Sequence, residues 1–259
     1  MRPTPSATSK PAAPNPARSK RRLHQDVLWH DLECGAYRAD LRLWLRLAER
    51  SPGPILDVGA GTGRVALELA RAGHHVVALD RDRRLLRALL ERAAGLEVEA
   101  VTADARRFAL RRPFPLILVP MQTVQLLGGP AGRSAFLACA RAHLSRGGLL
   151  ACALVGELVP FEPDDALPVP DIRELDGTVY ASRPVAVRRA GGRMALERVR
   201  ETVTPQGERT VKRNVVHLDL LQPAELIREA ADHDLRTERT RHIEATEDHV
   251  ASQVVLLRG

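Results

Sequence analysis

Apolar runs alternate with helical patterns through the first half of the chain. The strand-like runs lie at residues 55–58, 75–80, 96–101, 114–120 and 147–155. Helical periodicity or helix-forming composition lies between them, at about residues 63–72, 82–94 and 131–144. Strands that are nearly continuously apolar and that alternate with helices are typical of a parallel sheet covered on both faces. The pattern therefore predicts an α/β fold.

The pattern changes after about residue 160. Residues 178–221 are rich in β-forming residues around Gly191-Gly192 and Pro205-Gln206-Gly207, which read as hairpin turns. This part predicts an antiparallel flap inserted at about residues 160–221. Pro223 is suited to the first turn of a helix, and two further strands are expected at residues 235–243 and 252–259.

The N-terminal part has two sections. Residues 23–50 are expected to form a helical lid, whose apolar positions share one helical face and are Tyr37, Leu41, Trp44, Leu45 and Ala48. Residues 1–22 are rich in Pro, Ala and Ser, and they predict a disordered extension rather than a targeting or binding arm.

The net charge of +7 is concentrated in that extension. Residues 1–22 hold six of the 39 basic residues and no acidic residue, so residues 23–259 carry 33 basic and 32 acidic residues. A nearly neutral body lacks the clustered basic face of nucleic-acid-binding proteins, which makes nucleic acid an unlikely partner. No window resembles a membrane span. The three cysteines form no CxxC pair, which favours the cytoplasm and gives no metal site.

The stretch "ILDVGAGTGRVALELA", residues 55–70, places three glycines directly after a strand and before a helix. Such a loop brings backbone amides and a helix N-terminus close to a ligand. A dinucleotide fingerprint would need a further glycine at the position of Arg64, and a P-loop would need a lysine. Neither motif is present.

The pattern Asp57-x-Gly59-x-Gly61-x-Gly63 resembles motif I of the class I S-adenosylmethionine-dependent methyltransferases. Later landmarks follow in the family's order: Asp80 at the end of the second strand, Asp104-Ala105 after the third, and a Gly-Gly turn before the fifth. The resemblance implies a Rossmann-like, doubly wound, mostly parallel seven-stranded sheet. It also implies a methyltransferase domain over residues 51–259, with S-adenosylmethionine as the cofactor.

The resemblance assigns roles to the residues that match the family's motifs. Asp80 would bind the ribose hydroxyls, Asp104 and Ala105 would read the adenine edge, and Gly59 and Gly61 would let the backbone approach the methionine portion. The cofactor-binding residues implied are Asp57, Gly59, Ala60, Gly61, Asp80, Arg81, Asp104, Ala105 and Pro120. Asp80 and Asp104 have an alternative interpretation as helix N-caps.

Within the family, the chain is most similar to small-molecule enzymes of the glycine/sarcosine N-methyltransferase-like branch. It has no Asn/Asp-Pro-Pro-Tyr motif after the fourth strand, where Pro120-Met121-Gln122-Thr123 stands instead, so DNA adenine methylation is not expected. Gln122, Gln125 and Tyr37 are candidates for contact with the acceptor. No general base is evident, which favours a nitrogen acceptor over an oxygen acceptor.

Other polar and aromatic residues have structural interpretations. Trp44 is expected in the core, whereas Trp29 and Tyr37 either close over the cofactor or simply pack. His143 is expected to pack or cap, His217 to face solvent, and His233 to end a helix without binding metal.

Two alternative functions remain open. One is a catalytically silent S-adenosylmethionine sensor or scaffold, and the other is an RNA methyltransferase that uses the basic extension. The sequence leaves the acceptor and the oligomeric state open.

Overall fold

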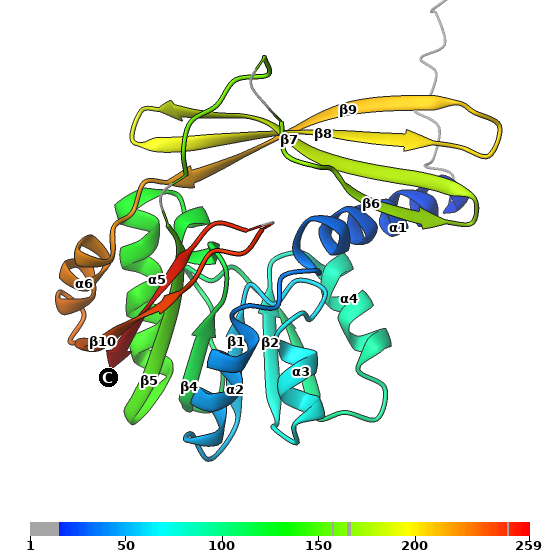
Figure 1. Cartoon of the computed structure of the whole chain (residues 1–259). Coiled ribbons are helices and arrows are strands. Elements are labelled where there is room, and N and C mark those ends of the chain that lie inside the picture. Colours follow the sequence, from blue (N-terminus) through cyan, green and yellow to red (C-terminus); the bar gives the residue numbers. More distant parts are fainter. Residues whose placement is uncertain (1–15, 157, 165–166, 248) are drawn as a thin grey trace, which may run out of the picture.

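A seven-stranded sheet forms the centre of the molecule in the computed structural model of the chain (Figure 1). The structure describes residues 16–156, 158–164, 167–247 and 249–259. The strands are β1 Ile55–Val58, β2 Val76–Asp80, β3 Val98–Thr102, β4 Phe114–Val119, β5 Leu144–Val155, β10 Arg236–Ile243 and β11 Ser252–Arg258. They lie in the order β10-β11-β5-β4-β1-β2-β3. β1 to β5 are parallel, whereas β11 runs antiparallel to β5 and β10, which confirms the predicted Rossmann-like sheet.

Helices cover both faces of this sheet. One face packs against α2 Leu41–Glu49, α3 Ala66–Arg71 and α4 Arg83–Arg92, and the other against α5 Gly129–His143 and α6 Pro223–Ala231. In β1, Ile55 packs into the first of these clusters and Leu56 into the second. Because successive side chains of a strand point to opposite faces, an apolar run without alternation has to be buried on both sides. The predicted strands and the helix that begins at Pro223 are confirmed.

The predicted insertion is an antiparallel sheet of four strands. These are β6 Asp171–Leu175, β7 Thr178–Ala190, β8 Arg193–Val203 and β9 Arg209–Asp219, in sequence order. Both predicted hairpin turns are present. The sequence pattern missed β6, which turns into β7 at Asp176 and Gly177, two residues with left-handed backbone conformations. Figure 1 shows the second sheet lying across one edge of the central sheet, with α1 beneath it.

The N-terminal part differs from the prediction in two ways. α1 spans Pro16–Cys34, so the last seven residues of the predicted disordered extension are helical, and residues 1–15 lie outside the described residues. Tyr37 precedes α2 instead of belonging to its helical face, because residues 38–41 form a turn closed by the Leu41 amide and the Arg38 carbonyl. Among the described residues, no helix is long and apolar enough to cross a membrane.

Candidate functional site

The glycine loop follows β1 at the edge of the sheet where the parallel strands end. Gly59, Gly61 and Gly63 all have positive φ angles, of 75°, 55° and 96°. Only glycine adopts such angles without strain, which explains why the loop needs glycine at alternate positions. The φ of Gly63 also delays the start of α3 to Ala66, three residues later than predicted. A Cβ at Gly63 would lie 2.8 Å from Leu89 of α4 and 2.9 Å from Leu67 of α3, so a larger residue here would crowd these two helices.

The surroundings of the first two glycines differ from the expectation. A Cβ at Gly59 would lie 2.6 Å from Cγ2 of Thr123, and a Cβ at Gly61 would clash with the imidazole of His30 on α1. The protein's own side chains, Thr123 and His30, therefore lie against the bare backbone that the resemblance assigns to the methionine portion of the cofactor. The residue between them, Ala60, is buried.

Asp80 at the end of β2 holds the glycine loop. The Gly61 amide donates to Oδ2 of Asp80 at 2.9 Å, and the Asp82 amide donates to Oδ1 at 2.8 Å. The alternative interpretation of Asp80 as a helix cap is wrong, because Asp82 caps α4 by accepting from the Arg84 amide. Asp80 thus stands beside the loop, where the ribose role was predicted. Its neighbour Arg81 is exposed.

Asp57 is a buried carboxylate beneath the loop. It is 1% exposed, and neither carboxylate oxygen has a hydrogen-bond partner of ordinary geometry among the described residues. Desolvation by burial raises the pKa of Asp57 to about 7, while the positive charge of Arg64 and the Ala66 amide oppose the rise. Apart from this amide, the described residues leave the acceptor capacity of the buried carboxylate unused. A cationic ligand above the loop would supply that partner.

The other predicted cofactor residues stand at the ends of β3 and β4. Asp104 is paired with Arg106 at 2.6 Å and accepts from the Arg106 amide, and these bonds hold the pKa of the carboxyl well below its usual range. The interpretation of Asp104 as a helix cap is wrong, because it closes a turn and no helix follows. Ala105 is half-buried beside it. At the end of β4, the Pro120 carbonyl accepts from the Thr123 hydroxyl at 3.0 Å.

The candidates for acceptor contact have different positions. Gln125 is buried: its Nε2 donates to the Asp219 carbonyl and its Oε1 accepts from the Val155 amide. This corrects the prediction that its amide faces an acceptor, since both ends of the amide tie the loop after β4 to β9 and β5. Gln122 is half-buried, and its contact with an acceptor stays a prediction.

The aromatic residues of the N-terminal part separate into three environments. Trp44 is fully buried in the core, as predicted, and its Nε1 donates to Asp40. Trp29 packs edge-on against Tyr180 of the inserted sheet at 5.5 Å between ring centroids. Tyr37 is buried between the Arg64 guanidinium and the ring of His249, and its hydroxyl lies 3.4 Å from Oγ of Ser252. Packing therefore accounts for both Trp29 and Tyr37 in this arrangement.

The histidines that were set aside have the expected structural roles. His143 accepts from the Leu110 amide and stacks beside Phe108. His217 is exposed on β9, and His233 lies 2.9 Å from the Ser134 hydroxyl at the end of α6. Within the part of the chain that the structure describes, no group of three ligand-type side chains could hold a metal ion.

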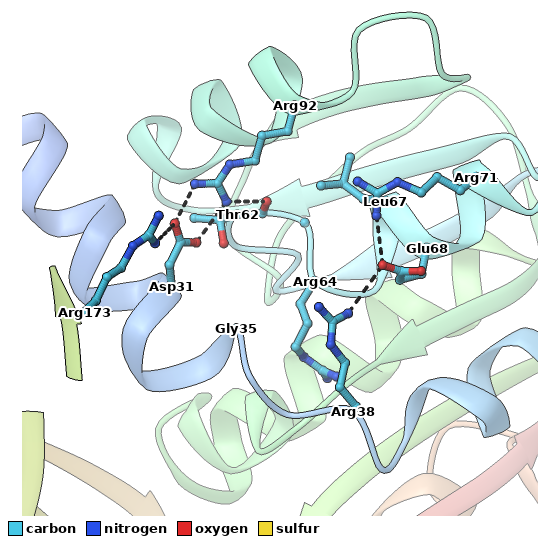
Figure 2. A pocket seen from close by; sticks show the side chains of 11 residues that line it. Asp31, Gly35, Arg38, Thr62, Arg64, Leu67, Glu68, Arg71, Arg92 and Arg173 are labelled. Carbon is cyan, nitrogen blue, oxygen red and sulfur yellow. Dashed lines mark hydrogen bonds and ion pairs between the residues drawn. The ribbon is translucent and has the colours of Figure 1, made fainter. Parts of the chain in front are cut away.

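Sequence reasoning missed the ion pairs that fix the N-terminal helices against the loop. Arg64 makes a buried two-bond pair with Asp40, at 2.6 and 2.7 Å, and also donates to the Tyr37 carbonyl. Asp31 of α1 makes a two-bond pair with Arg92 of α4, at 2.9 and 2.5 Å. Figure 2 shows both arginines on the wall of a groove of about 430 Å³ between α1, α3 and α4. The sequence signal for the first pair was Arg64 itself, a large charged residue inside a glycine loop.

Comparisons with known proteins agree with this geometry. Residues 55–148 match the family described as "Methyltransferase domain". The cypemycin N-terminal methyltransferase of Streptomyces sp. is 34% identical over 94 residues, a match that covers 36% of this chain and 38% of that protein. The sequence match thus spans little more than a third of the curated relative.

Solved structures extend the likeness in fold to nearly the whole chain. The sugar N-methyltransferase KedS8 from Streptoalloteichus sp. has a TM-score of 0.67 at 16% identity, covering 100% of this chain and 99% of that one. CalS10 from Micromonospora echinaspora, an amino pentose methyltransferase with bound S-adenosylmethionine, has a TM-score of 0.64 at 21% identity, covering 97% and 100%. The domain match over residues 55–148 and this likeness in fold together show a region similar to methyltransferase domains within a Rossmann-like fold that S-adenosylmethionine-dependent methyltransferases share.

Proposed function

We propose that the protein transfers the methyl group of S-adenosylmethionine to a nitrogen atom of a small-molecule acceptor. The observation that carries the proposal is the buried Asp57 carboxylate, whose oxygens have acceptor capacity to spare, beneath a loop of three glycines. The cofactor's methionine portion carries an ammonium group, and a buried carboxylate with acceptor capacity to spare suits a cation of that kind. The residues present therefore fit this cofactor.

The residues around the loop would hold the cofactor by distinct contacts. Asp57 would balance the ammonium group, directly or through water. Asp80 would accept from the ribose hydroxyls, for which its carboxylate has spare lone pairs beside the two amides that it already binds. Asp104 and Ala105 would contact the adenine. Arg106 would have to turn away from Asp104 when the adenine binds.

Methyl transfer requires the protein mainly to place the acceptor and the donor correctly. When bound, S-adenosylmethionine supplies a methyl group on a positively charged sulfur, which is already a reactive donor. The chain's contribution is to align the acceptor and to exclude water, and both are general sources of rate acceleration. The inserted sheet and α1 lie across the same edge of the sheet as the loop (Figure 1), which suits them to exclude solvent.

A nitrogen acceptor is favoured for two reasons. A neutral amine needs no strong base to act as a nucleophile, and the sequence motifs supply no evident general base. The relatives with informative names act on nitrogen: one is an N-terminal methyltransferase and another is a sugar N-methyltransferase. Gln122, which is half-buried in the loop after β4, remains the candidate for contact with the acceptor.

Calorimetry with the purified full chain tests the cofactor part of this proposal. We expect S-adenosylmethionine and S-adenosylhomocysteine to bind and NAD not to bind. Wild-type protein that binds NAD and neither of the other two would contradict the proposal. A protein that binds the cofactor but methylates no acceptor would support the sensor alternative.

A further inference from the structure

The imidazole of His30 lies on the glycine loop itself. His30 belongs to the last part of α1, and its ring takes up the side of Gly61 where a Cβ would be. Its Nδ1 lies 3.2 Å from the hydroxyl of Thr62, the next residue of the loop. His30 thus reaches the centre of the loop from α1.

Both approaches to Gly61 are closed in this arrangement. The Gly61 amide already donates to Asp80, and the bare face of its Cα is covered by His30. Gly61 has a φ of 55° and no side chain, so another group can come close to its backbone. In this structure that group is the His30 imidazole. A ligand that uses this glycine therefore has to displace the imidazole.

Two sets of ion pairs hold α1 on either side of His30. Asp31 binds Arg92 of α4, and Figure 2 shows Arg173 of β6 reaching the same carboxylate from the opposite side, at 3.8 Å. Glu33 accepts from Arg200 of β8 by two bonds of 2.7 Å and from the Ser182 hydroxyl of β7. The helix is thus attached both to the central domain and to the inserted sheet, and its movement would involve both.

We propose that His30 is a gate: the donor reaches the glycine loop when the imidazole leaves Gly61, and the imidazole stays displaced while the donor is bound. This inference rests on the proposed function, because it concerns access to the same loop. It makes His30 a positioning residue that controls the rate of donor entry without taking part in methyl transfer.

The charges around His30 make the gate sensitive to pH. Desolvation by burial lowers the pKa of His30, and Arg92 lowers it further, whereas Asp31 and Glu33 on α1 and Asp80 on β2 raise it. The net effect favours the neutral ring in the closed state. Protonation therefore weakens the closed state as the pH falls below the ordinary histidine range, and it does so without unfolding the sheet.

Stopped-flow binding of S-adenosylhomocysteine tests the gate, with the full chain and two substitutions. We expect His30→Ala to raise the association rate constant by about tenfold, because the closed population that limits entry disappears. His30→Phe keeps the bulk and loses the titration, so it should bind slowly at every pH. In the wild type the association rate should stay low from pH 8 to about 7 and increase as the pH falls from about 7 to about 5.

The control is His217→Ala, which removes an exposed histidine on β9. It should leave the association rate constant and its pH dependence unchanged. Thermal unfolding of each variant shows whether it is folded, and hydrogen exchange of α1 with and without the ligand reports the helix directly. Faster exchange of α1 during ligand entry supports the gate. An unchanged association rate in a folded His30→Ala variant, or a faster dissociation rate with loss of affinity, overturns it. Binding of neither ligand by any variant at any pH would instead overturn the proposed function, and the gate with it.

Discussion

At the scale of single residues, Asp57 of β1 and Asp80 of β2 both lie next to the glycine loop, but their carboxylates differ in how many hydrogen-bond donors they have. Asp80 is satisfied by two backbone amides, whereas Asp57 is buried with no partner of ordinary geometry among the described residues. Burying an unpaired carboxylate costs folding free energy, so selection for stability alone would replace it by an apolar or amide side chain. Its presence beneath the glycine loop is best explained by a cationic ligand.

The substitution Asp57→Asn tests that explanation through pH. The pKa of Asp57 is raised from 3.8 to about 7, so folding favours the protonated form, and the free energy of unfolding falls as the pH rises from 4 through 7. Removing the group should relieve this cost, by at most about 4 kcal/mol at pH 8 and by almost nothing at pH 4. Urea unfolding of both proteins at the two pH values measures the difference. An increase in the free energy of unfolding that is equal at both pH values would contradict this explanation.

Asp80→Ala tests the cofactor contact. We expect the dissociation constant for S-adenosylhomocysteine to rise about ten- to hundredfold, because charged hydrogen bonds to the ribose are lost and the Gly61 amide loses its partner. Asp82→Ala is the matched control two residues away. It removes the cap of α4, which should cost about 1 kcal/mol of stability and leave affinity unchanged. Equal effects of the two substitutions on affinity would count against the assigned role.

At the scale of elements, the glycine loop is fixed by helices that precede it in the sequence. Arg64 joins the loop to Asp40 at the start of α2, and Trp44 of α2 donates to the same carboxylate. Asp31 of α1 and Arg92 of α4 make a second connection. α1 is thus attached by charge to α4, and a movement of α1 away from the loop would break this pair.

The buried pair of Arg64 and Asp40 should be the more important of these connections for folding. Asp40→Ala leaves a buried guanidinium without its partner, which typically costs about 3–5 kcal/mol. Glu91→Ala is the control, because it breaks an exposed pair with Arg87 of α4 and should cost less than about 1 kcal/mol. Urea unfolding at neutral pH measures both. A loss for Asp40→Ala no larger than that for the control would be inconsistent with the buried geometry.

The elements show which features a sequence can predict. Periodicity predicted the strands of the central sheet and the hairpins of the insertion because each depends on neighbours within a few positions. The helix start at Ala66 was missed because it depends on the φ of Gly63, and β6 was missed because its turn uses a left-handed aspartate. Gln125 and His30 were misjudged or overlooked because their partners, Asp219 and Gly61, lie far away along the chain. Long-range pairing leaves no local signal.

At the scale of the whole molecule, the inserted sheet is attached to the central domain at both ends. Arg133 of α5, 1% exposed, pairs with Asp219 at the end of β9 and with Glu229 of α6. At the other end, Glu33 of α1 binds Arg200 of β8. These connections place the inserted sheet and α1 at the same edge of the central sheet as the glycine loop. An acceptor and the donor would both bind between this edge and the inserted sheet.

Transfer of an isotope-labelled methyl group from S-adenosylmethionine to a panel of small amines, with the matching alcohols and a bulk RNA sample, tests the central claim most directly. We expect the wild-type protein to place the label on a nitrogen atom of at least one amine, and Asp80→Ala to lose most of that transfer. Label found on RNA or on an alcohol oxygen, with none on any amine, would contradict the claim.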